Sequence, residues 1–208
     1  MTYKTVLFDV DNTLIDSATI AANVLHEITA QYGYDVSAAT VRGLVGIPTD
    51  KILQHLNLGH VAEITKEFTT AIGTHKDELT FFTGIQSLLS ELHQAGFATG
   101  IVTSRTSAEV DSDLGAFPEI TSSDIIVTAD KTTEHKPSGA PLEYAVTAHH
   151  LVKADTIYVG DTIYDMQAAQ NANMDFASAT WGALPTTDFS AATFQPQQPS
   201  DLLAILTK

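Results

Sequence analysis

The segment FDVDNTLIDS, residues 8–17, carries three aspartates and one asparagine directly after an apolar run. Asp9 and Asp11 are two positions apart, so in an extended chain their side chains lie on the same side, roughly 6–7 Å apart at a rise of ~3.3 Å per residue. That separation is too wide for two carboxyl groups that share one proton. It leaves room between them for a metal ion or for a reacting phosphorus atom.

A calcium loop and simple helix capping each account for only part of this acidic segment. It begins like an EF-hand calcium loop, but Leu14 stands where the loop needs glycine and Ile20 where it needs glutamate. Helix capping explains Asp16, and turn chemistry explains Asn12. Neither explains two acids at the end of a buried strand, where their mutual repulsion must be offset.

Three later segments also place polar residues directly after apolar runs. Thr103 and Ser104 offer hydroxyl and N–H groups near a helix start, which suits an anion, and Lys136 offers a point charge to a phosphate. Asp161 ends another run, and Asp165 follows one helical turn later. Singly, such residues are more often caps, loops or turns. Together they predict carboxylates, a lysine and hydroxyls at one end of a sheet, and carboxylate ligands without histidine or cysteine favour Mg²⁺.

The elements that would position these side chains follow from the hydrophobic pattern. Nearly continuous apolar, β-branched runs predict strands buried on both faces; they are residues 5–10, 98–104, 124–130, 156–161 and, more weakly, 175–180. Helical patterns separate the later runs, at residues 85–97, 140–151 and 164–174. This alternation predicts an α/β fold with a Rossmann-like, three-layer parallel sheet, in which ligands bind beyond the carboxyl ends of the strands.

Residues 16–80 interrupt the alternation. The first of their patterns is amphipathic, with apolar residues at i, i+3, i+4, i+7 and i+11 from Ala21. Three more helices are predicted at residues 37–46, 49–58 and 60–79, and a last short helix at the end of the chain, residues 201–208. We therefore expect two domains: an α/β core formed by residues 1–15 and 81–208, and an inserted all-helical cap formed by residues 16–80.

The composition indicates a globular chain with an acidic surface. Hydrophobic residues make up 44% of the 208, and no apolar run approaches the ~20 residues of a membrane helix, so we expect no membrane partner. A formal net charge of −15 repels nucleic acid, which is not expected as a partner either. The chain has no cysteine and its N-terminus lacks the pattern of a signal peptide, which favours the cytoplasm.

The segments DVDNT, TS, KP and GDTIYD resemble, in this order, the four motifs of haloacid dehalogenase-like hydrolases. The resemblance covers about residues 4–182 and is closest to the phosphoglycolate phosphatase-like branch, which inserts a helical cap after the first strand. It implies a phosphatase that acts on small phosphorylated metabolites through an aspartyl-phosphate, with Mg²⁺ as cofactor. A phosphosugar mutase and a pyrophosphatase of the same superfamily are the alternatives. The natural substrate stays open, as does the choice between a monomer and a homodimer.

The resemblance also implies a role for each motif residue. Asp9 matches the nucleophile and Asp11 the general acid and base. The residues expected to bind the substrate phosphate are Asn12, Thr103, Ser104, through its N–H group, and Lys136. Those expected to hold the metal are Asp9, Asp11 and Asp161, supported by Asp165.

Three positions depart from the family pattern. Asn12 stands where glycine is more common, although asparagine also reaches left-handed turn angles. Gly139 replaces the middle proline of a frequent Lys-Pro-x-Pro-x-Pro segment. Thr83 stands in place of the proline of the usual Pro-Gly entry from the cap to the core.

Several protein classes with related chemistry fit less well. True dehalogenases lack an aspartate at the position of Asp11, and receiver domains are far shorter and carry their acceptor on a middle strand. A binding protein that has lost turnover remains a third alternative, which a phosphatase assay with and without Mg²⁺ separates.

Overall fold

The structure is a computed structural model that describes residues 3–45 and 49–207. The chain divides into two compact units. Unit 1 consists of Met1–Ile15 and Phe81–Lys208, and unit 2 consists of Asp16–Thr80.

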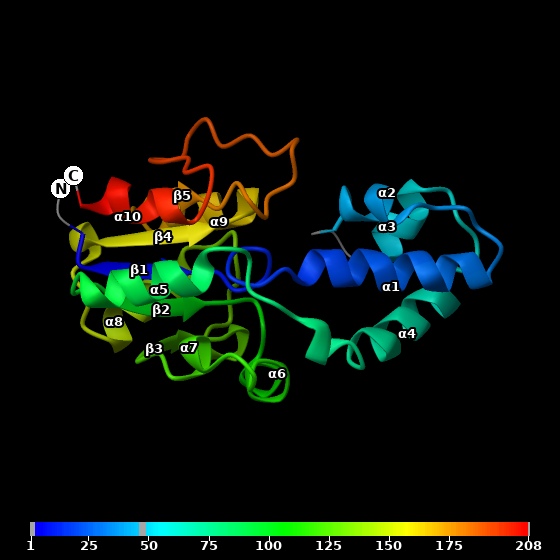
Figure 1. The fold of residues 1–208 in the computed structure, drawn as a ribbon, viewed down its shortest axis with the longest axis horizontal. Coiled ribbons are helices and arrows are strands. Elements are labelled where there is room, and N and C mark those ends of the chain that lie inside the picture. Colours follow the sequence, from blue (N-terminus) through cyan, green and yellow to red (C-terminus); the bar gives the residue numbers. More distant parts are fainter. Residues whose placement is uncertain (1–2, 46–48, 208) are drawn as a thin grey trace. The chain divides into compact units, whose positions relative to one another are not determined.

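Unit 1 is built on a five-stranded sheet in which all strands run parallel (Figure 1). The strands are β1 (Thr5–Phe8), β2 (Ala98–Val102), β3 (Ile125–Val127), β4 (Thr156–Gly160) and β5 (Asp175–Ser178). Their order is β3-β2-β1-β4-β5, which makes β1 the central strand. This is a Rossmann-like α/β fold, and the predicted fold class is confirmed.

The register of the sheet brings the polar residues that follow β1, β2 and β4 to one edge. Phe8, the last residue of β1, pairs with Ile101 on one side and Val159 on the other. The residues that come next on each strand therefore leave the sheet at the same level. The observed strands end earlier than their predicted ranges, because the polar residues at the ends of those ranges belong to the loops beyond the sheet.

Helices cover the sheet in two packed pairs. Helix α8 (Ala140–Ala148) contacts β2 and β3, α9 (Ile163–Asn171) contacts β4 and β5, and the two helices contact each other. Leu7, Tyr158 and Phe176 are buried against this pair. Helix α5 (Ile85–Gln94) contacts β2 and packs against α10 (Ser200–Leu206), and Figure 1 shows this second pair in front of the sheet.

Unit 2 is helical, as the sequence predicts. Its elements are α1 (Ser17–Gln31), α2 (Ala38–Arg42), α3 (Thr49–His55), α4 (Val61–Ile72) and the short 3₁₀ helix η1 (Lys76–Glu78). Leu25, Leu53 and Ile64 are fully buried in its core. Asp16 caps α1 by accepting a hydrogen bond from the Thr19 N–H group (3.1 Å), so the predicted capping role of that residue is confirmed.

Two helices between β2 and β3 were not predicted by apolar periodicity. Helix α6 (Ser107–Asp113) is too short for a periodic signal, but it begins with a capping box formed by Thr106 and Glu109. Helix α7 (Pro118–Thr121) has a proline at its first position, where the missing N–H group does no harm. The remaining 3₁₀ helices are η2 (Ala129–Lys131) and η3 (Lys153–Asp155).

Gly46 and Lys208, at the ends of two predicted helices, lie outside the described residues. No helix in the described part of the chain is both long enough and apolar enough to cross a membrane.

The chain leaves unit 1 and re-enters it at adjacent positions. Ile15 and Phe81 form an antiparallel bridge, and the Phe82 N–H group donates to the Leu14 carbonyl (3.0 Å). The Asp16 N–H group donates to the Thr80 carbonyl at the same distance. The two connecting segments are therefore held side by side.

Candidate active site

Three buried carboxylates meet where β1 and β4 end. Asp9 directly follows β1, Asp161 directly follows β4, and Asp165 lies in the first turn of α9. Each offers one oxygen, and these oxygens all lie within 4.8 Å of one another. All three residues are at most 6% exposed. Residues 152 positions apart in the chain are thus brought together by the parallel register alone.

Lys136 lies between two of these acids. Its Nζ atom donates to Oδ1 of Asp9 (2.8 Å) and to Oδ1 of Asp165 (2.7 Å), and its side chain is 8% exposed. Burial by itself would lower the pKa of Lys136, but the charges of Asp165 and Asp9 outweigh it and hold that pKa well above its usual value. The lysine is therefore a fixed positive charge inside the site.

One lysine does not neutralise three carboxylates. With all of them ionised, three negative charges face one positive charge, and two negative charges remain. Burial raises the pKa of Asp9 to about 7; the charge of Lys136 opposes this rise, and those of Asp165 and Asp11 add to it. Burial and the charges of Asp165 and Asp9 also raise the pKa of Asp161. The donor set therefore fits a divalent cation that prefers hard oxygen ligands, such as Mg²⁺.

Asp165 differs from the other two acids because both of its oxygens are already engaged. Oδ2 accepts hydrogen bonds from the N–H and hydroxyl groups of Thr162, the residue that caps α9. Oδ1 accepts from Lys136 and lies 3.0 Å from the Tyr158 hydroxyl. By contrast, the only described hydrogen-bond partner of the Asp161 carboxylate is the Thr13 hydroxyl, at 3.2 Å. Asp165 is thus placed to orient Lys136, and Asp161 retains oxygen lone pairs for a cation.

Gly160 makes the close approach of Asp165 possible. A Cβ atom at this position would lie 2.5 Å from both Cβ and Cγ of Asp165. The glycine of the GDTIYD segment is therefore required by packing, since any side chain there would displace the acid that supports the lysine.

Among the described residues, the group of three neighbouring carboxylates does not include Asp11. Its two oxygens accept hydrogen bonds from Nε and Nη2 of Arg105, at 2.8 and 2.7 Å. Arg105 also donates from Nη1 to Asp113 (3.0 Å). Sequence reasoning named neither Arg105 nor Asp113 as a site residue. Arg105 could have been suspected because it directly follows Thr103 and Ser104, two of the predicted site residues.

The expected phosphate-binding residues other than Lys136 lie in the loops after β1 and β2. Asn12 has a left-handed backbone (φ 57°). Glycine adopts this conformation most easily and asparagine also reaches it, which explains why asparagine can replace glycine here. Thr103 is buried, and its hydroxyl accepts a hydrogen bond from the Arg105 N–H group (3.2 Å). Ser104 is exposed. These residues surround the same edge of the sheet as the acids.

Residues close to the end of β5 hold the loop after β1 in place. The indole N–H of Trp181 donates to the Thr13 carbonyl (2.9 Å). A Cβ atom on Gly182 would lie 1.6 Å from the Asn12 carbonyl oxygen, so only glycine fits there without movement of one of the two loops. Neither contact follows from the sequence, because the two loops are about 170 positions apart.

The second departure from the family pattern also has a packing reason. A Cβ atom at Gly139 would lie 2.7 Å from the backbone nitrogen of Ala172, at the end of α9. The Asn171 side chain donates to the Pro137 carbonyl (2.8 Å). The loop that carries Lys136 is therefore fixed directly against the C-terminal end of α9.

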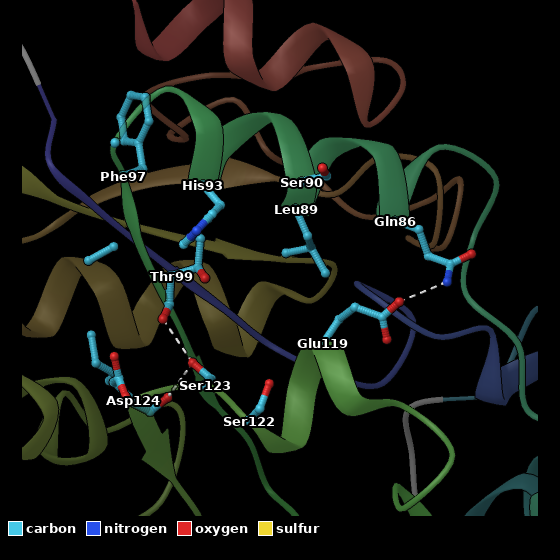
Figure 2. A pocket seen from close by; sticks show the side chains of 13 residues that line it. Gln86, Leu89, Ser90, His93, Phe97, Thr99, Glu119, Ser122, Ser123 and Asp124 are labelled. Carbon is cyan, nitrogen blue, oxygen red and sulfur yellow. Dashed lines mark hydrogen bonds between the residues drawn. The ribbon is translucent and has the colours of Figure 1, made fainter.

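A separate surface pocket of about 700 Å³ lies where β2 and β3 begin, at the opposite end of these strands (Figure 2). Gln86 of α5 and Glu119 of α7 are joined by a hydrogen bond of 2.9 Å beside it. None of the predicted site residues lines this pocket. The predicted site residues thus lie away from this pocket, at the carboxyl edge of the sheet.

The chain is similar to known proteins over most of its length. A family model described as haloacid dehalogenase-like hydrolase matches residues 6–179. The pyrophosphatase PpaX of Halalkalibacterium halodurans is 30% identical over 179 residues, which cover 85% of this chain and 83% of that protein. PpaX of Anoxybacillus flavithermus is 26% identical over 212 residues, which cover 99% and 98%.

A solved structure from Lactobacillus plantarum, proposed to be a phosphoglycolate phosphatase, superposes with a TM-score of 0.81. It is 28% identical, and the match covers 99% of this chain and 100% of that one.

Proposed function

Because the chain belongs to the haloacid dehalogenase-like hydrolase family, as its motifs predicted, we propose that it hydrolyses small phosphomonoesters through a phosphorylated Asp9, with Mg²⁺ as its metal. The observation that carries the proposal is the buried Asp9 carboxylate, which Lys136 holds at 2.8 Å beside Asp161. Membership of the family accounts for a carboxylate at the end of the central strand, and the hydrogen bond from Lys136 fixes the orientation of the Asp9 carboxylate.

In the first step, the Asp9 carboxylate attacks the phosphorus atom and the bond to the leaving oxygen breaks. Asp11, two residues further on, gives its proton to that oxygen, so the alcohol leaves as a neutral molecule. The products of this step are an acyl-phosphate on Asp9 and an ionised Asp11.

In the second step, Asp11 takes a proton from a water molecule as that water attacks the acyl-phosphate. Inorganic phosphate leaves, Asp9 is an ionised carboxylate again, and Asp11 is protonated for the next turnover. No other proton donor is needed, so one residue serves both steps.

The remaining site residues bind and orient the phosphoryl group. Lys136 and the Thr103 hydroxyl face negative phosphoryl oxygens, and Asn12 and the N–H group of Ser104 complete the set. Asp9 and Asp161 would hold the metal, which when bound neutralises charge on the phosphoryl oxygens. The participation of Asp11 as a metal ligand stays a prediction.

Pyrophosphate is the second candidate substrate. The relatives named pyrophosphatase PpaX match 85–99% of the chain at 25–30% identity. The same two steps apply to pyrophosphate, with phosphate as the leaving group in place of an alcohol.

We also propose that unit 2, residues 16–80, acts as a cap that selects the substrate. Its place in the sequence supports this, because it is inserted directly after the loop that carries Asp9, Asp11 and Asn12. Phosphoryl transfer depends mainly on positioning and on the exclusion of water, and a helical insert can supply both.

The test is phosphate release from phosphoglycolate, pyrophosphate and 4-nitrophenyl phosphate, with Mg²⁺ and with EDTA. We expect the unaltered protein to hydrolyse at least one of them in a Mg²⁺-dependent manner and Asp9→Asn to hydrolyse none. Rapid acid quench should trap radiolabelled phosphate on the unaltered protein only. Turnover by Asp9→Asn at the unaltered rate would overturn the proposal.

A further inference from the structure

We propose that Arg105 is a positioning residue that aims the Asp11 carboxylate at the leaving oxygen and at the attacking water. The inference rests on the proposed function, because it concerns the residue that serves there as acid and base. It adds a residue that the family motifs, as they stand in this sequence, do not include.

The contact between the two side chains has the geometry that orients a carboxylate best. Nε of Arg105 lies 2.8 Å from Oδ2 of Asp11, and Nη2 lies 2.7 Å from Oδ1. Two parallel N–H···O bonds fix both the plane and the direction of a carboxylate, which a lysine cannot do. Each Asp11 oxygen keeps a second lone pair, on which the residue can carry the proton that it transfers. Asp11 needs such a partner, since its side chain is 33% exposed and lies in a loop.

Arg105 is itself held in place from three sides. Nη1 donates to Asp113 of α6 (3.0 Å), the backbone N–H donates to the Thr103 hydroxyl (3.2 Å), and the backbone carbonyl accepts from Ala129 N–H (2.8 Å). The side chain is 17% exposed. Arg105 is therefore fixed relative to the loop after β2. Its hydrogen bonds to Asp11 then keep that acid–base residue at a constant distance from Thr103, the expected phosphate-binding threonine.

This arrangement predicts a specific kinetic effect. General acid–base catalysis accelerates a reaction by about 10²–10⁴-fold, and a misplaced acid–base group loses much of this acceleration. The loss in the first step depends on the leaving group: an alkoxide needs a proton as it departs, whereas 4-nitrophenolate is stable without one. A residue that merely ties two loops together would affect both kinds of substrate alike.

The experiment compares the unaltered protein with Arg105→Met, Arg105→Lys and Asp113→Asn. With enzyme in excess, release of the leaving group is followed in a single turnover for glycerol phosphate and for 4-nitrophenyl phosphate. For Arg105→Met we expect the rate constant with glycerol phosphate to fall by about tenfold or more and that with 4-nitrophenyl phosphate by less than about threefold. Arg105→Lys, which keeps the charge but only one hydrogen bond, should lie between.

Asp113→Asn is the matched control, because it weakens the outer contact of Arg105 and leaves both bonds to Asp11. It should change the ratio of the two rate constants by less than about twofold. The thermal midpoint and the Mg²⁺ affinity, measured by calorimetry, should stay within error of the unaltered protein in Arg105→Lys.

Two results would overturn the inference while the proposed function stands. One is an equal loss on both substrates in Arg105→Met. The other is an unchanged rate constant at saturating enzyme with a higher enzyme concentration for the half-maximal rate, which would make Arg105 a binding group for substrate. No hydrolysis of either substrate by the unaltered protein would instead overturn the proposed function, and this inference with it.

Discussion

The Nζ atom of Lys136 lies 2.8 Å from Oδ1 of Asp9, and both side chains are more than nine-tenths buried. The ion pair joins the loop after β3 to the end of β1 and continues to Asp165. In a site with more negative than positive charge, this lysine is the residue on which the burial of the acids depends.

Replacement of Lys136 by methionine should destabilise the protein and abolish turnover. The variant leaves two buried carboxylates without their cation, and loss of one partner of a buried pair lowers the free energy of unfolding by about 3–5 kcal/mol. Urea unfolding with EDTA present measures this. Lys4→Met is the control: Lys4 also contacts an aspartate at 2.7 Å, but its side chain is 73% exposed, so the change should stay below about 1 kcal/mol. Equal effects of the two substitutions would contradict this expectation.

Tyr158→Phe tests whether the Tyr158 hydroxyl helps to hold Lys136 in place. The Tyr158 hydroxyl lies 2.9 Å from the Val102 carbonyl and accepts a hydrogen bond from Lys136 Nζ (3.1 Å). Its loss should lower the free energy of unfolding by about 1–2 kcal/mol and kcat several-fold.

Tyr3→Phe is the matched control for that substitution. Tyr3 is also buried, and its hydroxyl donates to Asp175 (2.7 Å), where β5 begins and away from the acids. We expect a similar change in stability and an unchanged kcat. If kcat fell equally in both variants, the Tyr158 hydroxyl would have no specific part in the site.

The stability of the metal-free protein should fall as the pH rises from 5 to 7. Asp9 has a pKa of about 7 in the folded protein and ~3.9 in an unfolded chain. Between these values the folded state binds the proton and the unfolded state does not, so the free energy of unfolding decreases with pH and levels off above 7. The raised pKa of Asp161 acts in the same direction. The lowered pKa values of Asp130 and Asp188 act only at more acidic pH.

Unfolding by urea at pH 5, 6, 7 and 8 checks this, with EDTA and with Mg²⁺. The expected fall with EDTA is of the order of 2–4 kcal/mol, and Asp9→Asn should show a shallower one. We expect Mg²⁺ to bind the ionised acids and therefore to stabilise the protein more at pH 8 than at pH 5. A stability that rises between pH 5 and 7 in EDTA would refute the assignment of the acids as the dominant titrating groups.

Gly182→Ala should impair the site without touching a charged residue. The new methyl group would overlap the Asn12 carbonyl, so one of the two loops must shift. Overpacking of this kind destabilises by about 1–3 kcal/mol, and kcat/KM should fall because Asn12 moves. Gly115→Ala is the control, since the nearest atom to its Cβ would be the Asp111 carbonyl oxygen at 3.9 Å. Unchanged kcat/KM in Gly182→Ala would show that the Asn12 loop tolerates the shift.

The sequence predicted the sheet and the main acids because both depend on local patterns. Continuous apolar runs of β-branched residues identify strands in a parallel sheet, and residues such as Asp9 and Asp161 follow these runs directly. The rule that parallel strands end at a common edge then brings them together without further information.

The contacts that fix the site could not be predicted in this way. Arg105 binds Asp11 across 94 positions, and Tyr158 is indistinguishable in sequence from any other core residue of a strand. The close approach of Gly182 to Asn12 depends on the conformation of two loops. Such pairs are set by tertiary packing, and a single sequence has no periodic signal for them.

The paired hydrogen bonds at Leu14–Asp16 and Thr80–Phe82 have one more consequence. A polypeptide inserted between these segments must satisfy only one geometric condition, namely that its ends lie about one strand spacing, ~5 Å, apart. Helical segments of very different length and composition can meet that condition. Descendants of this gene could therefore exchange the whole insert while the backbone that carries Asp9 keeps its conformation.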